Sequence, residues 1–103
     1  MIPTGKSIDI LRRTSFRVPS EWKTKMGVIQ GKIAKFYIKS DCIIIKSCHE
    51  TTIEITSTIR ENGGIYIPIE VRNHFHLKGV NIFEIFIDEE NDQLLLNPKN
   101  EIK

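Results

Sequence analysis

The stretch Glu61-Asn62-Gly63-Gly64-Ile65-Tyr66-Ile67-Pro68-Ile69-Glu70-Val71-Arg72 decides the fold of this chain. Asn62-Gly63 is a strong signal for a two-residue hairpin turn, because both residues tolerate the positive φ that a type I′ turn requires. Ile65 and Ile67 alternate with Tyr66, so one face of the following strand is apolar. The sequence therefore predicts a tight turn that leads into a short strand with one buried face.

Pro68 marks the end of that strand and the beginning of a helix. It has no N–H with which to extend a β ladder, but it suits the first turn of a helix. The residues up to Phe75 supply about two helical turns, with Val71 and Phe75 four positions apart on one face. We expect a compact unit of hairpin, strand and helix.

Length and composition predict a small, soluble, β-rich protein. The 103 residues allow one compact domain, or two very small halves that share a core. Isoleucine is heavily used, which favours strands. No apolar run approaches the roughly 20 residues that span a bilayer, and the polar segment from Met1 to Asp9 lacks the apolar core of a signal peptide. We therefore expect a cytoplasmic protein in which Cys42 and Cys48 remain thiols with a packing role.

The charge is divided unequally between the two halves of the chain. Up to His49 the sequence has ten Lys and Arg against three Asp and Glu, a net charge of +7. From Glu50 onward there are five against ten, a net charge of −5. A basic half favours an anionic partner, whereas an acidic half does not.

Two successive segments of the chain show the same predicted order of elements. The first half predicts strands at Ser7–Leu11 and Ser15–Val18, a helix from Ser20 to Met26, and strands at Ile33–Ile38 and Cys42–Ser47. The second half predicts strands at Thr52–Ile59 and Ile65–Ile67, the helix after Pro68, and strands at Val80–Ile87 and Gln93–Leu96. Each half therefore reads β-β-α-β-β.

The prolines that precede the two predicted helices give the offset between the halves. Pro19 and Pro68 are 49 residues apart, and this offset also places Glu21 on Glu70 and Met26 on Phe75. We interpret the chain as a diverged internal duplication, with repeats at 1–49 and 50–103 that share one core.

The two repeats carry a family motif. Gly63-Gly64-Ile65-Tyr66-Ile67-Pro68-Ile69-Glu70-Val71-Arg72 resembles the AbrB-like swapped-hairpin (SpoVT/AbrB/MazE-type) family, and Ser15-Phe16-Arg17-Val18-Pro19-Ser20-Glu21-Trp22-Lys23 resembles it more weakly. In that family two chains interleave their hairpins into a small barrel that binds DNA or, in MazE-type antitoxins, also a toxin. The resemblance implies a mostly β fold with two short helices, in which two repeats intertwine into one swapped-hairpin β-barrel, a pseudo-dimer within one chain.

The resemblance also implies where DNA would bind. Gly64 replaces the family's arginine in the second repeat, and Thr14-Ser15 replaces the Gly-Arg pair in the first. We therefore expect the basic first repeat to hold DNA, mainly by phosphate contacts, which make the affinity dependent on salt. The predicted DNA-binding residues are Arg12, Arg13, Arg17, Lys23 and Lys25, with Arg60 and Arg72 as minor contributors.

The sequence gives little support to catalysis, a cofactor or a metal site. His74 and His76 are two positions apart, and neither they nor Cys48-His49 match the ligand spacing of a zinc module. No nucleophile elbow or phosphate loop occurs. The aromatic residues are instead expected to be structural, with Trp22, Phe75, Phe83 and Phe86 in the core and Tyr37 and Tyr66 half exposed.

The leading hypothesis is a small transcriptional regulator that binds double-stranded DNA through its basic first repeat. The alternative is a protein-interaction module, antitoxin-like or inhibitory, that uses the acidic second repeat. A protein partner and a homodimer remain open, whereas no membrane and no small-molecule substrate are expected.

Overall fold

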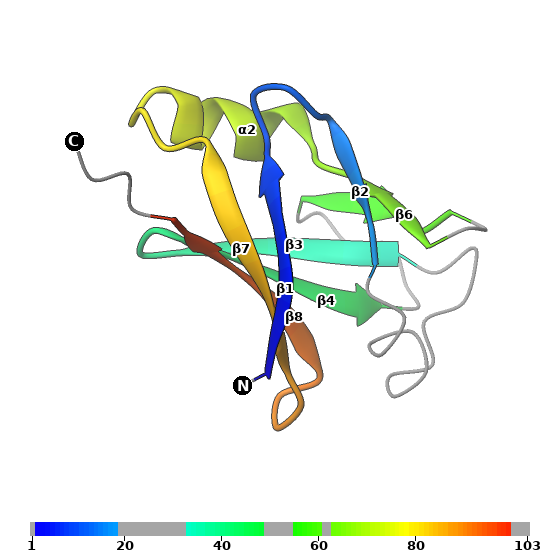
Figure 1. The fold of residues 1–103 in the computed structure, drawn as a ribbon. Helices are drawn as coiled ribbons and strands as arrows, with labels where there is room; N and C mark the ends of the chain where they lie inside the picture. Colours follow the sequence, from blue (N-terminus) through cyan, green and yellow to red (C-terminus); the bar gives the residue numbers. More distant parts are fainter. Residues whose placement is uncertain (1, 19–32, 49–54, 61–62, 100–103) are drawn as a thin grey trace.

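The protein is mostly β, with one short helix in the part of the chain that the structure describes (Figure 1). The structure, a computed structural model, describes residues 2–18, 33–48, 55–60 and 63–99. Its elements are β1 (Ile2–Asp9), β2 (Ser15–Arg17), β3 (Ile33–Lys39), β4 (Cys42–Cys48), β5 (Thr56–Thr58), β6 (Gly64–Tyr66), α2 (Ile69–His76), β7 (Ile82–Asp88) and β8 (Gln93–Pro98).

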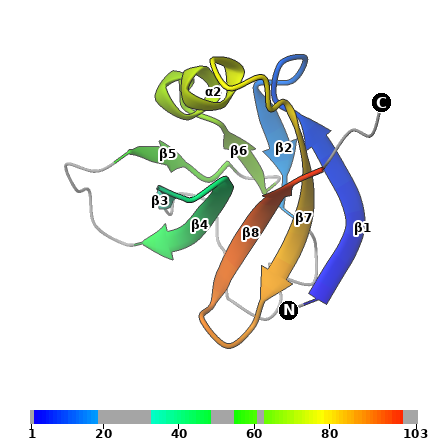
Figure 2. The same cartoon turned by 90° about the vertical axis from the view of Figure 1, so that its left-hand side faces the viewer.

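Six of the strands form one antiparallel sheet in the order β1-β7-β8-β4-β3-β5. The other two, β2 and β6, form a separate antiparallel ribbon. Figure 2 shows the large sheet curling, with the β2–β6 ribbon between its two ends and α2 above the ribbon.

The expected closed barrel is not found among the described residues. Closure would require the edge strands β1 and β5 to be hydrogen-bonded through β2 and β6. Ile59 forms a single isolated bridge with Ile65, which links the β5 side to β6 at one point. The large sheet is therefore open, with β1 and β5 as its edges.

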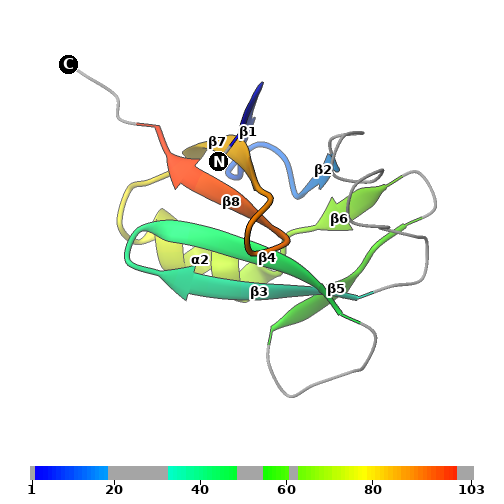
Figure 3. The same cartoon turned by 90° about the horizontal axis from the view of Figure 1, so that it is seen from below.

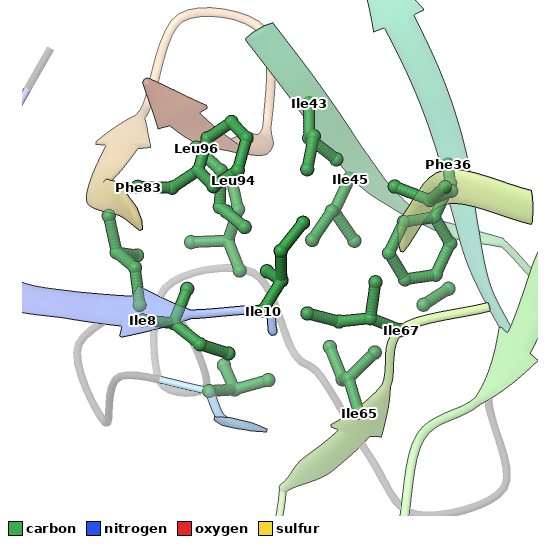
Figure 4. Packing of buried hydrophobic residues seen from close by; sticks show 14 of the residues in the cluster. Ile8, Ile10, Phe36, Ile43, Ile45, Ile65, Ile67, Phe83, Leu94 and Leu96 are labelled. Carbon is green, nitrogen blue, oxygen red and sulfur yellow. The ribbon is translucent and has the colours of Figure 1, made fainter. Parts of the chain in front are cut away.

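The core lies between the concave face of the large sheet, the ribbon and α2 (Figure 4). Alternate residues of the long strands point into it, as the period of a strand requires. Fully burying one such aliphatic or aromatic side chain contributes about 1.5–3 kcal/mol. The most deeply buried large side chains are Phe75, Phe83, Ile43, Ile45, Ile59, Ile65, Ile67, Ile87, Leu94 and Leu96.

The assignment of Phe86 to the core is wrong. On β7, Phe83, Ile85 and Ile87 point inward and are at most 4% exposed. Phe86 lies between two of these positions, so the alternation of the strand turns it to the outer face, where it is half-buried.

The helix after Pro68 is confirmed. Pro68 precedes α2 with φ −58°, and the helix buries Val71 and Phe75 completely. The ring of Phe75 meets that of Phe83 edge to face, at a centroid distance of 5.0 Å. These contacts fix α2 against β7. The other predicted helix, from Ser20 to Met26 with Trp22, lies outside the described residues.

The first strand is longer than predicted and contains a bulge. It begins at Ile2 rather than Ser7, because Ile2 and Pro3 pair with the far end of β7 before the register shifts. Gly5, with φ +77°, allows the shift, and the Thr4 hydroxyl donates a 2.7 Å hydrogen bond to the carbonyl of Ile85. Because of the bulge, both ends of β1 pair with β7 although the register changes between them.

The predicted hairpin around Asn62-Gly63 is only partly seen. Gly63 has φ +83°, and its N–H donates to the carbonyl of Arg60 at 2.9 Å. However, β5 covers only Thr56–Thr58 and pairs with β3, whereas β6 pairs with β2. Asn62 and residues 52–54 lie outside the described residues. The strands from Ile33 to Ser47 and from Gln93 to Leu96 are confirmed, each extended by one or two residues.

Candidate nucleic-acid interface

Four cationic side chains line one surface groove, which we call the basic groove. It has a volume of about 450 Å³ and is lined by Lys6, Arg13, Ser15, Phe16, Arg17, Arg60 and Gly64. An adjoining hollow of about 420 Å³ shares five of these residues and extends to Ser7, Ile8 and Ile85. No acidic residue is among the described residues that line either hollow. On its described walls the groove therefore presents four cations and no carboxylate.

The turn after β1 brings Arg13 to the groove. The carbonyl of Asp9 accepts hydrogen bonds from the N–H groups of Arg12 and Arg13, at 3.1 and 2.9 Å. The carboxylate of Asp9 also accepts from the N–H of Leu11 at 3.0 Å, so one aspartate organises the whole turn.

Arg12 does not line the basic groove. Its Nε lies 3.8 Å from the Asp9 carboxylate, and its side chain is 85% exposed. An ion pair this exposed is worth less than about 1 kcal/mol, so it leaves the guanidinium accessible. The predicted contact of Arg12 with DNA therefore stays a prediction, for a side chain that lies outside the basic groove.

The β2–β6 ribbon places Arg17 opposite Gly64. Because glycine has no side chain, nothing from β6 fills the space beside Arg17 at this position. Backbone hydrogen bonds hold the ribbon at both ends. The N–H of Val18 donates to the carbonyl of Gly63 at 2.8 Å, and the N–H of Ile67 donates to the carbonyl of Thr14 at 2.7 Å. A rigid two-stranded element thus carries the exposed Arg17.

Arg60 reaches the same groove from the second half of the chain. Its N–H donates to the carbonyl of Gly64 at 2.8 Å, and its carbonyl accepts from Gly63. The residue is exposed at the rim of the groove. From the sequence, Arg60 was predicted to be a minor contributor to DNA binding. In the structure it lines the same groove as Arg13 and Arg17.

Arg72 lies elsewhere and is already engaged within the protein. Its Nε donates to the carbonyl of Ile67 at 3.1 Å, and its Nη2 donates to the hydroxyl of Tyr66 at 2.8 Å. The guanidinium also lies over the Tyr66 ring, 5.5 Å from its centroid. Arg72 therefore fastens α2 to β6 and does not line the basic groove, so its role as a minor DNA contact stays a prediction. Lys23 and Lys25 lie outside the described residues.

Lys6 is the cation that the sequence analysis missed. It belongs to the bulge of β1, beside Gly5, and its N–H donates to the hydroxyl of Thr4 at 3.2 Å. A glycine inside a strand is a known sign of a bulge, and a bulge redirects neighbouring side chains. That signal in Gly5-Lys6 could have pointed to the residue.

The described residues show no arrangement that suggests a metal centre. In residues 2–18, 33–48, 55–60 and 63–99, no three His, Cys, Asp or Glu side chains gather as metal ligands would. The thiol of Cys42 donates to the amide oxygen of Asn97 at 3.2 Å, and burial followed by the nearby charge of Asp41 raises the pKa of this thiol. Cys42 is thus a poor nucleophile at neutral pH.

No helix within the described ranges has the length and apolar character needed to cross a membrane.

No protein-family model, curated protein or solved structure matches the chain.

Proposed function

We propose that this protein is a small DNA-binding transcriptional regulator that holds duplex DNA in the basic groove. The observation that carries the proposal is the convergence of Lys6, Arg13, Arg17 and Arg60 on one groove with no acidic residue among its described walls. Cations that line a groove whose described walls hold no carboxylate can neutralise phosphates and release the counterions of DNA. The first half supplies three of the four cations, in agreement with its net positive charge.

The β2–β6 ribbon supports an interaction with the duplex beyond phosphate binding. The major groove of B-DNA is wide enough to admit a two-stranded ribbon. On this ribbon the outward positions are Ser15, Arg17, Gly64 and Tyr66. Arginine can donate two parallel hydrogen bonds to a guanine edge, which a lysine cannot match. Within the proposal, Arg17 is the residue that reads bases, and Lys6, Arg13 and Arg60 bind phosphates.

The proposal includes the tandem swapped-hairpin architecture, with repeats at 1–49 and 50–103. The strand registers support it, because they repeat at the offset between the two prolines. Asp9 pairs with Ile82, and the residues 49 positions after and before them, Thr58 and Ile33, also pair. Phe16 pairs with Ile65, its own counterpart at that offset. Such reciprocity is the pattern that two repeats exchanging hairpins would produce.

A fluorescence-anisotropy titration with a labelled duplex at several salt concentrations tests the proposal. Three phosphate-binding cations predict that log K falls with log salt with a slope of about −2.7. The double variant Arg13→Ala with Arg17→Ala should bind roughly tenfold or more weakly and flatten the slope by about 1, because only Arg13 of the two contacts a phosphate. The matched control is Lys78→Ala with Lys99→Ala, which removes the same charge away from the groove and should leave the slope unchanged.

Two results would contradict DNA binding by this groove. One is the absence of binding to any duplex at low salt. The other is equal weakening by the arginine and lysine double variants, because binding would then follow net charge alone.

A second candidate function, a protein-interaction module, is favoured by the turn between β7 and β8. Glu89, Glu90 and Asp92 are all exposed there. A basic protein partner that binds this turn would survive nuclease treatment and be lost in the variant Glu89→Lys with Glu90→Lys. The affinity for DNA would be unchanged in that variant or would increase, because the variant replaces two negative charges by positive ones.

A further inference from the structure

The outer face of the large sheet carries an apolar row where a solvated sheet face is normally polar. Tyr37 on β3 pairs with Ile44 on β4, Ile44 pairs with Leu95 on β8, and Leu95 pairs with Phe86 on β7. All four side chains are half-buried and point away from the core. We call these four residues the outer row. Figure 3 views the molecule from the side of β3, β4 and β8, with α2 behind them.

Charges flank the outer row with opposite signs at its two ends. On the β3–β4 side, Lys35 and Lys46 pair directly with each other, and Lys39 lies on the other flank of the row. On the β7 side, Glu84 is exposed and faces outward, whereas Asp88 is buried and its carboxylate accepts hydrogen bonds from Asn91 and Gln93. The nearby Asp41 forms its ion pair with Lys78, 3.7 Å away. The face is thus cationic over β3 and β4 and anionic over β7.

We infer that this face docks a second copy of the chain, giving a two-fold symmetric dimer in which the outer rows pack against each other. A face with an apolar centre and opposite charges at its ends is complementary to itself when it is turned around. A second copy of the chain therefore supplies both the apolar surface and the opposite charges that this face requires.

The charges select one orientation of the second copy. A two-fold axis along the outer row would place β3 on β3, so that lysines would face lysines. An axis parallel to the strands, between β4 and β8, instead places β3 of one copy on β7 of the other. Lys39 then faces Glu84 of the second copy, because these residues occupy the same level on the same side of the row. The same operation brings Lys35 to the level of Asp88, but that carboxylate is buried and held by Asn91 and Gln93, so the Lys39–Glu84 contacts determine the orientation.

The shape of the face supports the same orientation. A hollow of about 480 Å³ lies beside Tyr37 and Ile44, with Lys39, Lys46, Asn91 and Gln93 around it. In the selected orientation, Phe86 of the second copy lies over Tyr37 and can enter this hollow. This explains why an aromatic side chain points outward in the middle of β7.

The size of the face predicts a weak dimer. Four strands about 4.8 Å apart and about six residues long give a face of roughly 20 Å by 20 Å. Two such faces bury about 800 Å² together, which is less than the roughly 1,200–2,000 Å² of a standard specific interface. We therefore expect a transient dimer that forms only at high protein concentration. Its association should weaken at high salt, because the Lys39–Glu84 contacts remain partly solvated.

Sedimentation velocity of the full chain over a range of concentrations, at about 50 mM and about 500 mM salt, tests the inference. The wild type should dimerise at low salt and dissociate more readily at high salt. Lys39→Glu and Glu84→Lys should each raise the dimer Kd roughly tenfold, because two like-charged contacts replace two attractive ones. The double variant Lys39→Glu with Glu84→Lys should restore the wild-type Kd.

A matched control and a fold check complete the experiment. Glu70→Lys makes the same charge change as Glu84→Lys at an exposed position on α2, away from this face, so it should leave the Kd unchanged. Far-UV circular dichroism of each variant checks that the fold is kept. The inference is overturned if the wild type is monomeric at low salt throughout, or if the double variant dimerises no better than the single ones. This result does not depend on DNA, so it is separate from the outcome for the basic groove.

Discussion

At the scale of single residues, Asp88 shows how one carboxylate organises a turn. It accepts hydrogen bonds from Nδ2 of Asn91 at 2.9 Å, from Nε2 of Gln93 at 3.0 Å and from the N–H of Asn91 at 3.4 Å. These donors favour the charged form, so the pKa of Asp88 lies below its ordinary value of 3.8, mainly because of the Asn91 side chain. The stabilisation is therefore present at neutral pH and lost as the pH falls below about 4 and through the lower pKa of the folded protein.

We predict that Asp88→Asn lowers the urea midpoint of unfolding at pH 7, and that the difference from wild type shrinks at about pH 2.5. The reason is that wild-type Asp88 is progressively protonated as the pH falls through its lowered pKa, and a protonated aspartate is similar to asparagine. Asp92→Asn is the matched control, since Asp92 is exposed with φ +51°, a conformation that asparagine tolerates. An equal difference at both pH values would show that the charge of Asp88 does not matter.

At the scale of elements, strand β7 offers a matched pair of aromatic residues. Phe83 is completely buried and touches the Phe75 ring, whereas Phe86 lies on the outer face. We predict that Phe83→Ala lowers the free energy of unfolding by about 3–5 kcal/mol, because it leaves a cavity in the core. Phe86→Ala should cost less than half as much, since its site is open to solvent. Urea unfolding at a concentration low enough for the monomer checks this, and equal costs would contradict the assigned faces.

The same two residues show what the sequence can predict about the elements. The alternation of apolar and polar residues located most of the long strands. Pro68 and the four-residue spacing of Val71 and Phe75 located the helix. Both signals are local in the sequence. The face of Phe86 was predictable too, since Phe83, Ile85 and Ile87 fix the phase of β7, but hydrophobicity alone suggested the core. The partner of β6 was not predictable, because it depends on which distant strand lies nearest.

The candidate site was predicted in part for the same reason. Arg13 and Arg17 stand close to each other in the sequence, and a local motif was enough to select them. Lys6 and Arg60 join them only because β1 and the residues after β5 meet the ribbon in three dimensions. The hydrogen bond from Arg72 to the hydroxyl of Tyr66 could not be predicted, because a charge pattern does not reveal such a specific contact.

At the scale of the whole molecule, neither half of the chain can complete its own sheet. In the structure β1 of the first half pairs with β7 of the second, and β5 of the second half pairs with β3 of the first. The centre of the sheet also joins the halves, through β4 and β8. The basic groove draws Lys6, Arg13 and Arg17 from one half and Arg60 from the other. Stability and the proposed function therefore both require the two halves together.

We predict that residues 1–49 and 50–103, prepared as separate chains, are each unfolded or self-associated and form a folded one-to-one complex when mixed. Each half is close to the length below which a lone domain rarely folds, and each lacks the strands that its edges pair with. Amide spectra of the isotopically labelled first half should gain native dispersion when the unlabelled second half is added, with the intact chain as the reference. Sedimentation gives the stoichiometry. A half that shows native dispersion as a monomer would contradict the interdependence, because it would mean that one half can satisfy its strand edges without the other.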